Sequence, residues 1–176
     1  MRPLAPARGI VLVRACKVML VAIVGVLISL VALGNLMNYD ANWQFVRHVL
    51  AMDTIFPGSH LLWRAITNRG LQTAAYLAII SWEVLNAMVI IIATVGLAAN
   101  VGNADGFTGA APLAVLGLTM VIILFGFGFI AIGGEWFLMW QSTTWNGIES
   151  AFRYVTLAGL TILVLLGGNG NEPETR

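Results

Sequence analysis

LQTAAYLAIISWEVLNAMVIIIATVGLAA, residues 71–99, is a stretch of 29 residues in which Glu83 is the only charged residue. An α-helix needs about 20 mostly apolar residues to cross the roughly 30 Å hydrocarbon core of a membrane. This stretch is long enough to cross a membrane completely. It therefore predicts a transmembrane helix with one carboxyl group near its middle.

Three more apolar stretches of similar length flank this one. Two of them contain no charged residue, and the third carries two charges in its first two turns, where long side chains can reach the lipid headgroups. Together with residues 71–99, the predicted spans are 18–37, 113–134 and 147–166. The pattern predicts an all-α, polytopic membrane protein, a four-transmembrane-helix bundle in which residues 1–176 form a single membrane domain.

The composition of the whole chain agrees with this prediction. Hydrophobic residues make up 59% of the 176 residues and charged residues only 10%, which excludes an ordinary soluble domain. The formal net charge of +1 is too small to indicate nucleic-acid binding. Because Cys16 is the single cysteine, the chain has no intrachain disulfide.

Local signals predict where two of the helices begin. Pro112 suits the first position of a helix, so the Gly- and Asn-rich residues 100–111 before it are expected to form a short flexible turn. Asn146 and Glu149 have the spacing of a capping box at the start of the last span. Glu149 and Arg153 are an i, i+4 pair that would stabilise the same helix start.

Basic residues near the N-terminus predict the orientation of the bundle. Four of them precede the first span with no acidic residue among them: Arg2, Arg8, Arg14 and Lys17. Lys and Arg accumulate in cytoplasmic segments, so we expect the N-terminus, and after four spans the C-terminus, in the cytoplasm. Counted alone, the arginines of the first connection favour the opposite orientation: Arg47, Arg64 and Arg69.

The two connections predicted on the other side, residues 38–70 and 135–146, carry much of the chain's polar and aromatic chemistry. Five of the six tryptophans lie in them: Trp43, Trp63, Trp136, Trp140 and Trp145. An aromatic belt at the headgroups would explain such a composition. The opposite helix ends carry no tryptophan, however, and symmetric anchoring would not produce this asymmetry, so the alternative interpretation is a lid.

Residues 42–52, NWQFVRHVLAM, predict a short amphipathic helix at the membrane surface within the first connection. Phe45, Val49 and Met52 recur on one helical side, next to other apolar residues. With the second connection, this helix defines a candidate interaction surface, the outer face. Its expected members are Trp43, His48, Trp63, Arg64, Glu135, Trp136, Trp140, Trp145, Asn146, Glu149 and Arg153.

Glu83 is the strongest single candidate for a functional residue. Tyr76, Glu83 and Asn86 recur at roughly helical spacing, which indicates a polar stripe that faces the bundle interior. A structural interpretation has a protonated Glu83 bound to Asn35, Asn86 or a backbone carbonyl. The functional interpretation is a carboxyl group that carries a proton or binds a cation.

Other chemistries find little support in the sequence. Residues 126–131, GFGFIA, match the letters of a dinucleotide-binding motif but lie inside an apolar span without a preceding strand. His48 and His60, the only histidines, lie outside the spans, which argues against haem ligation, and they lack the spacing of a metal site. We therefore assign no catalytic residue, no cofactor and no metal.

Several motifs taken together resemble those of a known family. They are NYDANWQFVRHVLAMD at 38–53, WRAIT at 63–67, the Trp82–Glu83 pair and GGEWFLMWQSTTWNGIESAFR at 133–153. From about residue 17 to residue 166 the chain resembles an uncharacterised bacterial family of predicted small integral membrane proteins, domain of unknown function 2165. The resemblance implies a bacterial inner-membrane protein with four spans and implies no catalytic residue.

Three functions are compatible with these features. The first is an accessory or scaffold subunit, without catalytic activity, whose outer face binds another membrane component or a second copy of the chain. The second is a small proton-coupled transporter or channel that uses Glu83. The third is an enzyme of the membrane surface that works with Glu135, Glu149 or His48.

Overall fold

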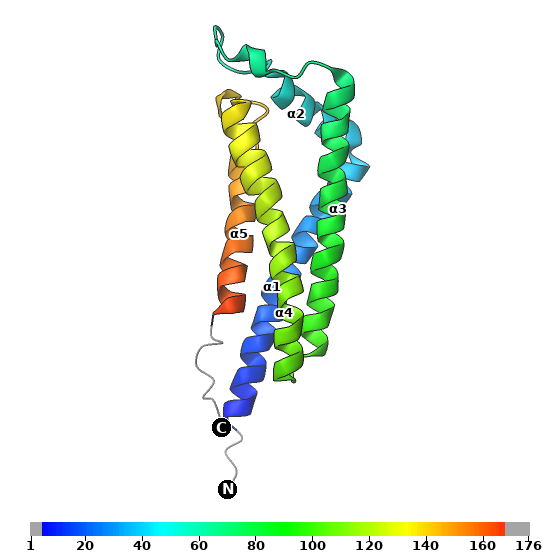
Figure 1. Ribbon diagram of the computed structural model, residues 1–176, viewed down its shortest axis with the longest axis vertical. Helices are drawn as coiled ribbons and strands as arrows, with labels where there is room; N and C mark the ends of the chain where they lie inside the picture. Colours follow the sequence, from blue (N-terminus) through cyan, green and yellow to red (C-terminus); the bar gives the residue numbers. More distant parts are fainter. Residues whose placement is uncertain (1–4, 168–176) are drawn as a thin grey trace.

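The computed structural model describes residues 5–167, and these residues form a bundle of long helices with short elements at one end (Figure 1). The long helices are α1 (Ala5–Met37), α3 (Arg69–Ala99), α4 (Ala104–Ile122) with its continuation η2 (Ile123–Trp136), and α5 (Ile148–Leu166). The short elements are α2 (Tyr39–Ala51), η1 (Leu62–Arg64) and η3 (Met139–Gln141). The all-α fold class is confirmed.

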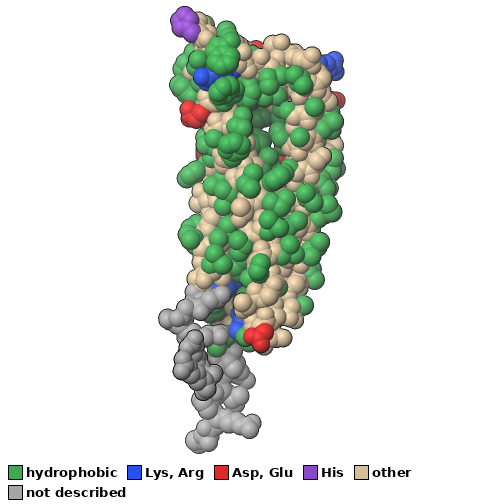
Figure 2. All heavy atoms as spheres, in the orientation of Figure 1, with side chains coloured by type: hydrophobic (Ala, Val, Ile, Leu, Met, Phe, Trp, Pro, Cys, Tyr) green, Lys and Arg blue, Asp and Glu red, His purple; other side chains and the backbone are tan. Residues whose placement is uncertain are grey.

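Four segments of the described part are long and apolar enough to cross a membrane, as predicted: Gly9–Met37, Arg69–Ala99, Ala104–Trp136 and Ile148–Leu166. Hydrophobic side chains cover the length of the bundle, whereas charged side chains gather near its two ends (Figure 2). Large apolar residues such as Leu30, Val95 and Leu163 are more than 60% exposed. Only a hydrocarbon environment makes such a surface favourable.

The two ends of the bundle differ in structure. The start of α1, the end of α5 and the α3–α4 connection lie at one end, which we call the terminal end (Figure 1). Helix α2 crosses the other, the loop end, together with the connection that contains η3. The two tryptophan-rich connections therefore do emerge at the same end of the bundle. The predicted short helix of the first connection is confirmed as α2.

The first helix begins earlier than the predicted residue 18, because it accommodates basic residues within its length. Lys17 is only 7% exposed. Its Nζ donates hydrogen bonds to the carbonyl oxygens of Leu165, at 3.1 Å, and Gly167, at 2.8 Å. The last carbonyl groups of a helix have no partner within the helix, so Lys17 caps the end of α5. Arg2, which contributed to the predicted orientation, lies outside the described residues.

The predicted start of α4 is wrong, and that of α5 is right to within one residue although its cap differs. Helix α4 begins at Ala104, because Asn103 caps it by accepting a hydrogen bond from the Gly106 N–H at 3.3 Å. Pro112 therefore lies inside α4 instead of at its start. The predicted capping box of α5 is absent from the described structure, because Asn146 accepts from the Ile148 N–H at 3.1 Å and the cap position belongs to Gly147.

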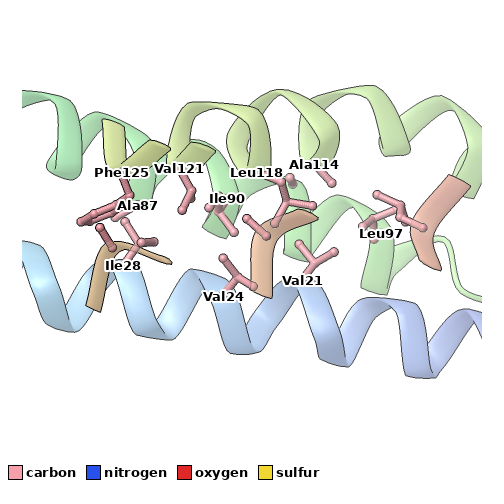
Figure 3. Close-up of a cluster of buried hydrophobic side chains, with 14 of the residues drawn as sticks. Val21, Val24, Ile28, Ala87, Ile90, Leu97, Ala114, Leu118, Val121 and Phe125 are labelled. Atoms are coloured by element: carbon pink, nitrogen blue, oxygen red, sulfur yellow. The ribbon is translucent and has the colours of Figure 1, made fainter. Parts of the chain in front are cut away.

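The main apolar core runs along the inside of the bundle. Its residues come from α1, α3, α4, η2 and α5, and many are fully buried (Figure 3). Ile90 of α3 lies between α1 and α4, and a glycine of each of these two helices faces it. A Cβ atom added at Gly25 of α1 would lie 2.9 Å from Ile90, and one added at Gly117 of α4 would lie 2.5 Å from it. Glycine at both positions thus lets α1 and α4 pack against Ile90.

Helix α4 changes its hydrogen bonding at Ile123 and continues to Trp136 as the π-helix η2. Side chains of α3 bind its backbone just before the change. Trp82 Nε1 donates to the Met120 carbonyl at 3.1 Å. Asn86, with its amide oriented to satisfy both partners, donates to the Gly117 carbonyl at 2.9 Å and accepts from the Val121 N–H at 3.1 Å. Whereas α4 packs on both α3 and α5, η2 packs mainly on α5, and the bundle opens toward the loop end.

Candidate functional site

A polar cavity of about 390 Å³ lies beneath α2 at the loop end of the bundle. It forms where η2 leaves α3, and α1, α2 and α5 complete its walls. Its polar lining comes from Asn35, Asn42, Tyr76, Glu83, Asn146 and Ser150. Its aromatic lining comes from Phe45, Phe125, Phe129 and Tyr154. No basic residue of the described chain lines this cavity.

Glu83 reaches the polar cavity from the middle of α3 and is only 1% exposed to solvent. Asn35 Nδ2 of α1 donates a hydrogen bond to Glu83 Oε2 at 2.6 Å. The Tyr76 hydroxyl in turn donates to the Asn35 carbonyl at 2.9 Å. Within residues 5–167, the other carboxyl oxygen, Oε1, accepts no hydrogen bond. The carboxyl group is therefore held in place on one side and keeps one acceptor for a ligand.

The predicted polar stripe of α3 is buried, but its members have different surroundings. Tyr76 and Glu83 line the polar cavity, as described above. Asn86 is fully buried and binds the backbone of α4 instead. Gln72 is also buried and donates to the Ile66 carbonyl at 2.7 Å, which attaches the first connection to α3. Only part of the stripe thus belongs to a site, and Asn86 has a structural contact.

Other residues of the cavity were not singled out by the sequence. Phe125 and Phe129 are spaced i, i+4 in an apolar stretch, a pattern that equally suits a lipid-facing surface. Ser150 and Tyr154 lie one turn apart on α5, and no catalytic or binding motif singled out either residue. These four residues line the same cavity as Glu83 because η2 and α5 diverge from α3. No local sequence pattern predicts this divergence.

Direct contacts join the two tryptophan-rich connections. The Thr54 hydroxyl donates to the Ser142 hydroxyl at 2.9 Å, and the Phe56 N–H donates to Gln141 Oε1 at 3.0 Å. The Phe56 ring also meets the Trp140 ring edge-to-face, with centroids 5.8 Å apart. The two connections therefore form one surface, as expected from their emergence at the same end.

One group of predicted outer-face residues surrounds Arg64. Its guanidinium carbon lies 4.4 Å from the centre of the Trp136 ring and 5.5 Å from that of Trp63. The two indole rings meet edge-to-face at 5.9 Å. Trp63 is 71% exposed, and Trp136 and Trp140 are each almost half exposed. This group is the exposed aromatic part of the outer face.

The remaining outer-face residues lie in separate surroundings. His48 stacks on Trp145, with ring centroids 4.7 Å apart, and its Nδ1 lies 2.8 Å from a carboxyl oxygen of Asp53. Trp43 Nε1 donates to the Thr73 hydroxyl at 3.2 Å. Glu149 and Arg153 form the predicted ion pair and are exposed, as is Glu135. Asn146 lines the polar cavity. The residues of the predicted outer face therefore lie in several clusters at the loop end, and their role in an interaction stays a prediction.

Comparison of the sequence with known protein families identifies the family of this chain. Residues 13–167 match the family described as Predicted small integral membrane protein (DUF2165). The chain belongs to this family. It is thus a small, multi-pass integral membrane protein of a family whose function is unknown, and the resemblance seen in its motifs is confirmed. No curated protein and no solved structure matches the chain significantly.

In this member of the family, the polar cavity is the feature best suited to bind a ligand. No group of three or more His, Cys, Asp or Glu residues in the described chain is placed to hold a metal ion. The cavity instead combines a few hydrogen-bonding groups with aromatic walls, which is the usual composition of a small-molecule site. Burying an ionisable residue inside a membrane span is costly, so such residues are rare and often belong to functional sites.

Proposed function

We propose that this protein is a non-catalytic binding protein of a bacterial inner membrane, and that its ligand carries a hydrogen-bond-donating group such as an amine. The observation that carries the proposal is the unbound Oε1 of Glu83 at a cavity of about 390 Å³. Because no basic residue of the described chain lines the cavity, this oxygen is available to a donor that enters it, and the aromatic walls strengthen the resulting hydrogen bond.

Binding has more support than transport, because the polar cavity does not continue toward the terminal end. The tightly packed core residues Val24, Ile90 and Leu118 fill the space between α1, α3 and α4 there, and none is more than 1% exposed. A transported solute would need these helices to separate. A bound ligand requires only the cavity that the fold already contains.

Photoaffinity labelling tests the proposed ligand site. The protein in lipid nanodiscs is exposed to a benzylamine that carries a diazirine, and labelled peptides are identified by mass spectrometry. We expect labels on peptides that line the polar cavity. Glu83→Gln should abolish them, because Asn35 holds one amide atom as before and the amide nitrogen then replaces the free acceptor Oε1 by a donor. Equal labelling of Glu83→Gln and the wild type would refute the proposal.

Two further variants make this result specific. Glu149→Gln removes the same charge outside the polar cavity, where Glu149 pairs with Arg153, and should label like the wild type. Ser150→Phe fills the cavity from an exposed position on α5 without replacing a buried side chain. It should lose labelling even if Glu83→Gln alters the packing of the bundle.

A second candidate function is an accessory subunit that binds another membrane component or a second copy of the chain. The exposed aromatic cluster of Trp63, Trp136 and Trp140 favours it, because large exposed aromatic residues are enriched at protein interfaces. Native-size separation of the tagged protein in mild detergent tests this function. A larger complex that is lost when Trp136 and Trp140 are both changed to Ala would support it, and migration of the wild type as a single chain would exclude it.

The same proposal includes the orientation of the bundle. Arg14 and Lys17 lie near the terminal end, and we propose that this end faces the cytoplasm. Contacts between arginines and aromatic rings occur at both ends, Arg14 at Phe107 and Arg64 at Trp136, so the proposal rests on the basic segment without acidic residues that precedes the first span. A Cys16→Ala protein with Asp53→Cys should react with an impermeant maleimide from outside. Reaction only from the cytoplasm would reverse the orientation.

A further inference from the structure

A second cavity, of about 310 Å³, lies under α2 between α3 and η2. Its lining is almost wholly apolar, whereas the polar cavity contains Glu83 and three asparagines. The lining of the apolar cavity includes Phe45, Ala75, Ala78, Gly128, Phe129 and Gly133. No carboxyl group or basic group of the described chain lines it.

The two cavities are neighbours. Phe45, Val46, Ile79 and Phe129 line both of them and so form their common wall. The rings of Phe45 and Phe129 stack, with centroids 6.3 Å apart and planes 19° from parallel. Residues of three different elements, α2, α3 and η2, thus form this wall. A chain that extends from one cavity into the other has to displace side chains of the wall, of which the stacked rings of Phe45 and Phe129 are the largest.

The apolar cavity has room because several of its lining residues are small. Ala75 and Ala78 face it from α3, and Gly128 and Gly133 face it from η2. Ala78 is exposed on the surface of the bundle that contacts lipid. The apolar cavity therefore borders the lipid-facing surface of the bundle at Ala78.

We propose that the two cavities together bind a single-chain amphiphile. Its hydrogen-bond-donating head lies in the polar cavity at Glu83 Oε1, and its alkyl chain passes the ring of Phe45 into the apolar cavity. This inference rests on the proposed function and names the ligand class for the same site. The observation behind this inference is that a polar cavity and an apolar cavity share a wall. A purely polar solute would leave the apolar cavity empty, and a hydrocarbon alone would leave Glu83 without a hydrogen-bond donor.

A pair of probes with the same head tests the inference. One is the diazirine-bearing benzylamine used above, and the other is an alkylamine with its diazirine near the end of the chain. Both are added to the protein in nanodiscs. The alkylamine should label apolar-cavity peptides from α3 and η2. It should also compete with benzylamine labelling at about tenfold lower concentration than an unlabelled benzylamine, because its chain adds buried apolar surface.

A matched pair of variants on α3 supplies the control. Ala78→Trp fills the apolar cavity from an exposed position, whereas Ala74→Trp adds the same side chain one turn away, at an exposed position that lines neither cavity. Ala78→Trp should reduce alkylamine binding about tenfold and leave benzylamine labelling unchanged, and Ala74→Trp should affect neither.

The possible failures are distinguishable. If Glu83→Gln abolishes benzylamine labelling but Ala78→Trp leaves alkylamine binding unchanged, the ligand site stands and the amphiphile inference is wrong. If alkylamine labels spread over all lipid-facing helices and ignore Ala78→Trp, the chain merely dissolves in the bilayer and the inference is again wrong. If the benzylamine does not label the polar cavity of the wild-type protein, the proposed function itself is wrong.

Discussion

Asn35 of α1 donates its side-chain amide to Glu83 of α3 at 2.6 Å, and this hydrogen bond joins the two helices beside the polar cavity. The Tyr76 hydroxyl binds the main-chain carbonyl of Asn35 and so fixes the same turn of α1. The carboxyl group of Glu83 thus has a defined position before any ligand arrives. Such preorganisation lowers the cost of binding.

The first prediction concerns the coupling of these two residues. Asn35→Leu and Glu83→Leu should each destabilise the bundle, and the double variant should lose less stability than the two single losses together. We expect a coupling of about 0.6 to 1.7 kcal/mol, as for other hydrogen bonds between membrane helices. Unfolding in mixed micelles measures all four proteins. Strict additivity would mean that the hydrogen bond contributes nothing.

The second prediction concerns the glycines around Ile90. A methyl group at Gly117 or Gly25 would overlap the Ile90 side chain, so Gly117→Ala and Gly25→Ala should each lower the free energy of unfolding by about 1 to 3 kcal/mol. Gly109 and Gly159 have open space around them and serve as controls. Gly109→Ala and Gly159→Ala should be neutral or stabilise by up to about 1 kcal/mol, since Ala favours helix.

The third prediction concerns the change from α4 to η2. Trp82→Phe removes the donor to the Met120 carbonyl and keeps an aromatic ring, so the contact that joins α3 to α4 just before η2 should loosen. Spin labels at exposed positions Ala78 and Phe127 should then report a broader distance distribution than in the wild-type background. Trp63→Phe, at an exposed site remote from this contact, should leave the distance unchanged. An unchanged distance in Trp82→Phe would show that its hydrogen bond does not hold the junction.

The fourth prediction concerns Lys17. Lys17→Met keeps the length of the side chain but removes the donors to Leu165 and Gly167. Amide exchange should accelerate in the last turn of α5 and stay unchanged in its first turn. Lys17→Arg retains donors and should exchange more like the wild type. Uniform exchange in all three proteins would mean that Lys17 does not cap α5.

Some features of the site could be read from residues taken singly or in short patterns. Glu83 stands out because a carboxyl group in 29 apolar residues has no local explanation. Tyr76, one stripe position before it, follows from helical spacing. The emergence of the two tryptophan-rich connections at the same end follows from the number of spans. These predictions use only hydropathy and periodicity, which are sums over neighbouring residues.

Other features depend on contacts between distant parts of the chain. Lys17 looked like a cytoplasmic flank, yet it caps α5 by donating to the carbonyl of Leu165, 148 residues later in the chain. Pro112 looked like a helix start, but α4 begins eight residues earlier, at Ala104, where Asn103 caps it. Phe129 and Ser150 looked like ordinary span residues, although both line the polar cavity.

The sequence by itself therefore determined that the chain enters a membrane, which segments cross it and which end carries the tryptophans, because insertion depends on local apolar length. Only the tertiary structure decided that Glu83 lines a cavity, that an apolar cavity lies beside it, and that Phe45 and Phe129 stand between them. The physical reason is the divergence of η2 from α3. That divergence begins where Trp82 and Asn86 bind the backbone of another helix, and such a contact exists only after the helices have packed.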